Sequence, residues 1–241
     1  SILTLIFSLI QIKEILPLIK INTKNLVNDV IKDIKESIFM ISFQVFVLFN
    51  NLFPLIILGF YQRAEVLGNF KLALQISSVS GIVLHSINKI VQPRIAKSFS
   101  LKKFVYLEKI ALRSNRFTFT YTIIISIFIF IFYEKFISLF FGTEFLIPTK
   151  NFFVIMLIPI INSIFGSVGS IINMTGNEKV AIKWCGIALI IGLFSNLFFI
   201  PIFGINGAAI SIIIASFIRG IALWRESYTL LKVKSSFILN E

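Results

Sequence analysis

One apolar stretch of the chain, residues 64–92, carries polar side chains along a single helical face, while Leu72, Ile76 and Val83 stand on its other faces. The polar members Lys71, Gln75, Ser78 and His85 stand at i, i+4, i+7 and i+14, and the stripe continues with Lys89 and Gln92. A polar stripe of this length is costly against lipid. The spacing therefore predicts that this face lines a water-filled cavity.

Two members of this stripe have a second interpretation that stays open. Lys71 stands near the start of the stretch, where a lysine can extend its ammonium group to the lipid headgroups instead of a cavity. His85 can equally be a packed side chain whose ring nitrogens are satisfied by neighbours. Under the cavity interpretation the first four residues of the stripe can meet one ligand, whereas the snorkelling and packing interpretations give these two residues a structural role only.

The stretch before it adds a second set of polar groups. Gln44 and Asn51 stand seven residues apart on one face, with Asn50 beside them and Pro54 following. Proline removes a backbone donor and predicts a bend. A bent polar helix suits a cavity wall, and a packing kink with interhelical amide bonds explains the same residues equally well.

Near the end of the chain, Arg219 shares a face with three small residues, Gly207, Ser211 and Ala215. The small residues favour close helix approach, as does the Gly-Ser-Val-Gly-Ser run at 166–170. Arg219 is a candidate for binding an anionic group. The interpretation favoured by its place near the end of the stretch is snorkelling or helix capping.

No residue set typical of catalysis is present. The sequence has one histidine and one cysteine, Cys185, and it lacks a Gly-rich phosphate loop or an acidic pair within the apolar stretches. We therefore expect no enzyme, no metal site and no cofactor.

Composition assigns the chain to a membrane class. Of its 241 residues, 57% are hydrophobic and 14% are charged, and the mean hydropathy is +0.94. A soluble domain has about a quarter of its residues charged. Without period-two alternation of the length that a membrane strand needs, the sequence predicts an all-α, polytopic membrane helix bundle.

Six apolar stretches are long enough to span a bilayer, which takes about 20 residues; they are 37–60, 64–92, 117–141, 146–173, 180–203 and 205–224. Residues 1–12 are apolar but too short, and we expect them to be the end of a preceding helix. The amphipathic pattern of residues 13–36 predicts a cytoplasmic linker helix, and that of residues 94–113 predicts a second helix lying on the membrane. The C-terminal lobe, formed by the six spans, is predicted at 37–241.

The basic residues are divided unequally between the two sides. Eighteen of the 23 lysines and arginines fall before the first span, in alternate connections or in the tail, and three fall on the opposite side. By the positive-inside rule, the basic connections and the C-terminus are cytoplasmic. This topology, with attraction to anionic lipids, explains the net charge of +12 without nucleic acid as a partner.

Four short motifs occur in order between the spans: Gln-Pro-Arg-Ile-Ala-Lys at 92–97, Phe-Phe-Gly-Thr-Glu-Phe at 140–145, Asn-Met-Thr-Gly-Asn-Glu-Lys at 173–179 and Phe-Gly-Ile-Asn-Gly-Ala-Ala-Ile at 203–210. Their order and spacing resemble the C-terminal half of polysaccharide and O-antigen flippases of the multidrug/oligosaccharidyl-lipid/polysaccharide superfamily. The resemblance covers nearly the whole chain.

The resemblance implies one six-helix lobe of a two-lobe, alternating-access transporter, with 1–12 as the end of the sixth helix. It implies a cationic cavity that receives an undecaprenyl-pyrophosphate-linked oligosaccharide in the bacterial inner membrane, for surface polysaccharide or O-antigen synthesis. The partners would be this substrate, membrane lipids and an N-terminal lobe that supplies the other wall of the cavity. The resemblance also places Lys71 at the cavity.

Three alternatives remain open. A multidrug or cation antiporter of the same superfamily would use membrane-embedded carboxylates, and none stands well inside these spans. A membrane-embedded polysaccharide polymerase would have a large polar external loop, whereas the longest external connection, around 133–151, is short. A non-transporting scaffold is the least favoured.

The charge distribution predicts the topology directly. Reporter fusions should give a cytoplasmic signal in the basic connections and an external signal in the others, because the bias is eighteen residues to three. An external signal in the 94–116 connection, which contributes the largest share of the bias, would overturn the orientation. The cytoplasmic fusions follow Lys35, Lys103, Lys179 and Lys234, and the external ones lie near Gln62 and Thr149.

Overall fold

The computed structural model describes residues 23–231. Within that range the regular elements are helices, with no strand, so the all-α prediction is confirmed. The chain divides into two units, 1–38 and 39–241, and the first long helix runs across the boundary. The predicted end of a preceding helix at 1–12 lies outside the described residues. The elements are α2 (Thr23–Tyr61), α3 (Ala64–Val79), α4 (Ile82–Ser100), α5 (Phe104–Phe140), the 3₁₀ turn η2 (Thr143–Phe145), α6 (Thr149–Phe165), α7 (Val168–Met174), α8 (Glu178–Phe203) and α9 (Ile205–Leu231).

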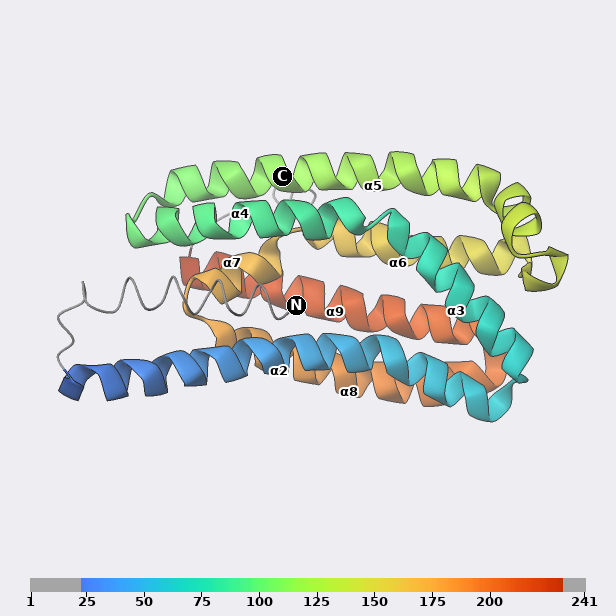
Figure 1. The fold of residues 1–241 in the computed structure, drawn as a ribbon, viewed down its shortest axis with the longest axis horizontal. Coiled ribbons are helices and arrows are strands. Elements are labelled where there is room, and N and C mark those ends of the chain that lie inside the picture. Colours follow the sequence, from blue (N-terminus) through green and yellow to red (C-terminus); the bar gives the residue numbers. More distant parts are fainter. Residues whose placement is uncertain (1–22, 232–241) are drawn as a thin grey trace, which may run out of the picture. The chain divides into compact units, whose positions relative to one another are not determined.

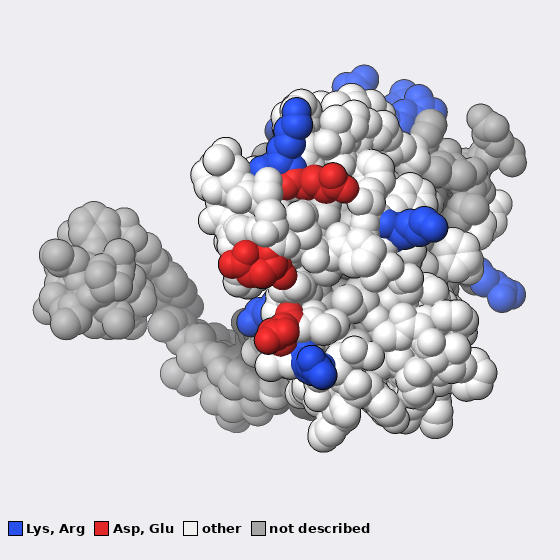
Figure 2. All heavy atoms as spheres, turned by 90° about the vertical axis from the view of Figure 1, so that its right-hand side faces the viewer, with Lys and Arg blue, Asp and Glu red and all other residues white. Residues whose placement is uncertain are grey.

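Four helices are long and apolar enough to cross a membrane: Ile41–Tyr61 of α2, α5, α8 and α9. Two bent pairs, α3 with α4 and α6 with α7, raise the number to six if each pair is one span. Large apolar side chains stay exposed on the outside of the bundle, as with Phe194 at 67%. Figure 2 shows the end of the second unit where α5 ends and α6 begins, on which a few charged side chains of both signs stand in a mostly uncharged surface. These features support a membrane protein.

Helix α9 is the packing centre of the second unit, where it lies against α6, α7 and α8 (Figure 1). Its buried face is made mostly of small residues, including Gly207, Ala208 and Ala215. A Cβ at Gly207 would overlap the backbone of α8 at Phe199. The close approach predicted from small residues is therefore present, and it allows two apolar helices to pack backbone to backbone.

Two predicted spans are broken. The stretch 64–92 divides at Ser80 and Gly81 into α3 and α4, which are bent by 49°. The stretch 146–173 divides at Gly166 and Ser167 into α6 and α7, bent by 45°. Helix α2, in contrast, continues through Pro54, where the sequence predicted a bend. Glycine–serine pairs, rather than proline, interrupt these helices.

The membrane-surface helix predicted at 94–113 is not present as one element. Helix α4 continues to Ser100, and α5 begins at Phe104. The turn between them is closed by the amide of Lys103, which donates to the Ser98 carbonyl at 2.9 Å. Lys102 takes a φ of 54°, a left-handed conformation that non-glycine residues adopt only in a few per cent of cases. No glycine or proline marks this turn, and the sequence therefore predicts one continuous helix where the structure has two.

Serine hydroxyls satisfy carbonyl oxygens around the first break. Ser80 Oγ donates to the Ser77 carbonyl at 2.7 Å, and Ser77 Oγ donates to the Leu74 carbonyl at 2.9 Å. The amide of Gly81 bonds the Ser78 carbonyl at 2.9 Å. Backbone groups inside a membrane need internal partners, and here the local side chains supply them.

The second break is fixed from a different helix. Asn115, a buried residue of α5, accepts hydrogen bonds at its Oδ1 from the Ser167 amide at 2.8 Å and from the Ser167 hydroxyl at 2.9 Å. Gly166 takes φ 51° and ψ −117°, a conformation close to unavailable to residues with a Cβ. A Cβ at Gly166 would also overlap the Asn115 amide. Gly166 and Asn115 together hold the α6–α7 break in one geometry.

We expect Gly166→Ala to destabilise the bundle by about 2–3 kcal/mol, because it adds backbone strain and displaces Asn115 from Ser167. The measurement is the thermal unfolding midpoint in detergent, followed by tryptophan fluorescence. Gly68→Ala is the matched control: a Cβ there has no atom within 4 Å, and alanine favours helix. Equal midpoints for the two variants would contradict a strained break at Gly166.

Candidate functional site

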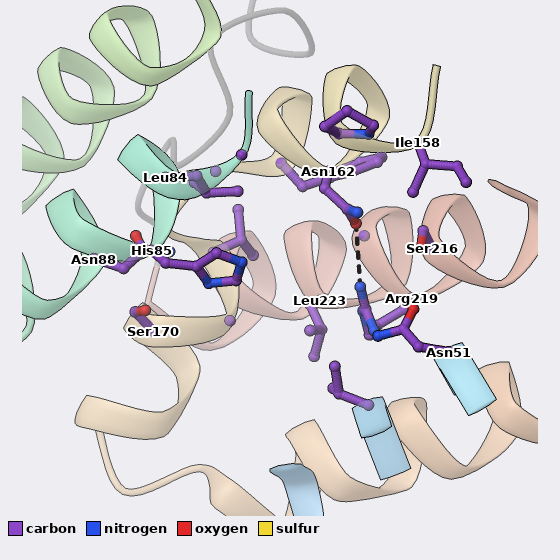
Figure 3. A pocket seen from close by; sticks show the side chains of 18 of the residues that line it. Asn51, Leu84, His85, Asn88, Ile158, Asn162, Ser170, Ser216, Arg219 and Leu223 are labelled. Carbon is purple, nitrogen blue, oxygen red and sulfur yellow. Dashed lines mark hydrogen bonds between the residues drawn. The ribbon is translucent and has the colours of Figure 1, made fainter. Parts of the chain in front are cut away.

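A cavity of about 570 Å³ lies in the second unit between α2, α3, α4, α6, α7 and α9 (Figure 3). Both helix breaks border it, through Gly81 and Gly166. Among its lining residues, all in the described part of the chain, there is no aspartate or glutamate. The polar lining residues are Gln44, Asn51, Ser77, Ser78, His85, Asn88, Lys89, Gln92, Asn162, Ser170, Asn173, Ser216 and Arg219.

Five of the eight residues that the sequence singled out lie at this cavity: Gln44, Asn51, Ser78, His85 and Arg219. Figure 3 shows His85 and Arg219 extending into the space from α4 and α9, with Asn51 close to Arg219. The two later members of the polar stripe, Lys89 and Gln92, also line it.

The other three residues are placed elsewhere. Lys71 and Gln75 are exposed on α3, before the bend, and are not among the lining residues. The first three members of the stripe all stand on α3, before the 49° bend, and of these only Ser78, the one next to the bend, lines the cavity. Asn50 is buried with its amide oxygen against Gly192 of α8, which is a packing contact between helices. The substrate role of these three residues stays a prediction.

Arg219 has a neutral partner. Its Nη2 donates to Asn162 Oδ1 on α6 at 3.2 Å, the bond drawn in Figure 3. Among the residues whose side chains the structure describes, no carboxylate pairs with Arg219. An arginine inside a membrane bundle is usually paired with an acid. An amide orients the guanidinium without neutralising it, so its positive charge remains available to an anion.

Helices α6 and α7 contribute polar residues that the sequence analysis missed. Asn162, Ser170 and Asn173 line the cavity, and Gln92 Nε2 donates to Ser170 Oγ at 3.2 Å, which joins α4 to α7. A signal was available, because the three polar residues and Gly166 recur with helical spacing in an apolar stretch. From the sequence, only the 166–170 run of this pattern is interpreted, as a site of close helix approach, and Asn162 stays unassigned.

Two buried amide oxygens at the cavity have no hydrogen-bond partner among the described residues: Asn88 Oδ1 and Asn173 Oδ1. Buried polar atoms are normally satisfied, and an exception at a cavity points to water or a ligand as the partner. The set can therefore bind a molecule that carries both negative charge and hydrogen-bonding groups. In the described part of the chain, the lining offers no paired nucleophile and base, and no group of three or more metal-ligating side chains occurs.

Comparisons with family models, with curated proteins and with solved structures gave no match.

The neutral Asn162 partner yields a test of the anion site. Asn162→Asp would place a carboxylate beside Arg219 and neutralise it, so we expect inorganic pyrophosphate affinity to fall at least about tenfold. Asn162→Ala removes the bond but keeps the charge, and its affinity should stay within about threefold. Calorimetric titration of the purified chain in detergent measures both. Wild-type affinity in the aspartate variant would exclude Arg219 as the anion-binding group.

Proposed function

We propose that this chain is one lobe of a membrane flippase that moves an undecaprenyl-pyrophosphate-linked oligosaccharide across the bacterial inner membrane, for surface polysaccharide or O-antigen synthesis. The observation that carries the proposal is the cavity inside an apolar bundle, which holds two cations, Arg219 and Lys89, and no carboxylate among its described lining residues.

The chemistry of the lining fits such a head group. A pyrophosphate needs cations where water is scarce, because its charges would otherwise be unpaired. Arg219 can offer a planar set of donors to phosphate oxygens, and Lys89 adds a second charge. The amides of Asn51, Asn88 and Asn173 both donate and accept hydrogen bonds, as sugar hydroxyls require.

The two broken helices support transport in particular. Transporters place substrate sites beside discontinuous membrane helices, whose freed backbone groups face a polar cavity. Here both breaks border the cavity. In the proposed cycle the head group enters from the cytoplasmic side, the two lobes rock, and the head group leaves outside, with the C-terminus cytoplasmic throughout.

The antiporter alternative is less well supported by the same cavity. Exchange of a drug or cation for protons or sodium uses a membrane-embedded carboxylate, and the lining residues in the described part of the chain include none. A cavity with two cations also repels a cationic drug. The multidrug interpretation therefore has no carboxylate among the described lining residues to carry it.

The two cations should dominate head-group affinity. We expect Arg219→Ala and Lys89→Ala each to lower the affinity for farnesyl pyrophosphate at least about tenfold, because each removes a charge facing the ligand. Calorimetry on the chain in nanodiscs is the measurement. Arg225→Ala on α9 and Lys97→Ala on α4 are matched controls, because they remove the same charges from exposed positions outside the cavity.

Equal losses in the variants and in the controls would reduce the effect to net charge and contradict a cavity site. Lys71→Ala belongs in the same series, because the sequence predicts that Lys71 binds the substrate although it does not line the cavity. A loss of binding there would extend the site along α3, and unchanged binding would restrict it to the cavity.

A further inference from the structure

A second hollow adjoins the cavity, and its chemistry is different. It is a groove of about 610 Å³ bounded by α2, by Gln92 in the middle of α4 and by the end of α7. Five residues line both spaces: Gln44, Val47, Asn51, Gln92 and Asn173. Four of these carry amides, so they form a polar border between the two.

The residues that belong to the groove alone are all apolar: Ile41, Val45, Leu48 and Met174. Ile41 is 62% exposed and Leu48 is 55% exposed. Both lie in the membrane-span candidate Ile41–Tyr61, so the groove opens on an apolar face of that span. Met174 adds a flexible thioether that adapts to irregular hydrocarbon shapes.

Given the proposed transport of a lipid-linked substrate, we propose that this groove holds the hydrocarbon chain of the same molecule whose anionic head group occupies the cavity. The amide border lies where the head group joins the chain. A molecule that fills both spaces must be charged at one end and apolar along the other, which a soluble nucleotide, a free sugar phosphate and a neutral lipid are not.

The class of molecule in the groove follows from two features: the groove is continuous with the cationic cavity, and its own walls are apolar. A soluble ligand would leave the apolar groove walls against lipid and gain nothing from them. A neutral lipid would fill the groove but leave Arg219 and Lys89 without an anion. An anionic amphiphile satisfies both at once, and the chain then stays in hydrocarbon while the head group sits in the bundle.

Photolabelling in phosphatidylcholine nanodiscs tests this. The probe is geranylgeranyl phosphate with a diazirine at the far end of its chain, and geranylgeraniol with the same diazirine is its uncharged partner. We expect the phosphate probe to label Val45, Leu48 and Met174 at least fivefold more than the exposed α8 residues Phe194 and Phe198. The alcohol should label both faces alike, and excess inorganic pyrophosphate should abolish the enrichment.

A pair of variants removes the dependence on labelling chemistry. Val45→Trp fills the groove and should lower the affinity for the phosphate probe at least tenfold, while inorganic pyrophosphate affinity stays within twofold. Phe194→Trp, on the lipid-facing side of α8, should change neither. If Val45→Trp lowers both affinities, the substitution has disrupted the cavity as well as the groove. The labelling of the wild-type chain by the phosphate and alcohol probes then tests the groove.

Three outcomes would overturn the proposal. Equal labelling of groove and α8 by the phosphate probe would mean that the groove is ordinary lipid-facing surface. Protection from both probes, with crosslinks between two copies of the chain, would assign it to a protein partner. Retained pyrophosphate binding without groove enrichment defeats the groove alone, whereas absent pyrophosphate binding defeats the proposed function itself.

Discussion

The structure depends on how a membrane bundle satisfies peptide groups where its helices stop. Inside lipid there is no water to accept or donate the freed hydrogen bonds, so each interruption needs a dedicated partner. Asn115 supplies it at the α6–α7 break, and Ser77 and Ser80 supply it at the α3–α4 break. Because these partners are internal, the bundle can bend two spans toward one point. The cavity lies at that point.

The same constraint governs the charges. A guanidinium within apolar helices needs hydrogen bonds, and a carboxylate would provide them while cancelling the charge. Asn162 provides one at 3.2 Å and leaves the charge in place. The cavity is thereby polar, electropositive and incompletely satisfied, since Asn88 Oδ1 and Asn173 Oδ1 remain without partners in the described range. An anion that also carries hydroxyl donors would complement both the cations and these acceptor oxygens.

The class, the helical content and the limits of several helices could be predicted from the sequence, because hydropathy and length determine them. The site could be predicted in part. Gln44 and Asn51 reach the cavity because α2 is one continuous helix there, and helical spacing then holds. Lys71 does not: it stands midway along α3, and the stripe on that helix reaches the cavity only at Ser78, next to a bend that no local pattern records. Asn162 went unassigned for a related reason: its significance comes from Arg219, 57 residues away.

The length of α5 has a consequence for how the protein sits in its membrane. Its 37 residues extend about 55 Å at 1.5 Å per residue, against about 30 Å of hydrocarbon. Roughly two fifths of the helix must therefore lie outside the hydrocarbon or be accommodated by tilt. Its first four turns carry Lys109, Arg113 and Arg116, which suit the headgroup layer. In a thinner bilayer, more of this basic segment would lie outside the hydrocarbon, and the bundle would not have to compress. The length of α5 therefore lets the protein fit membranes of different thickness.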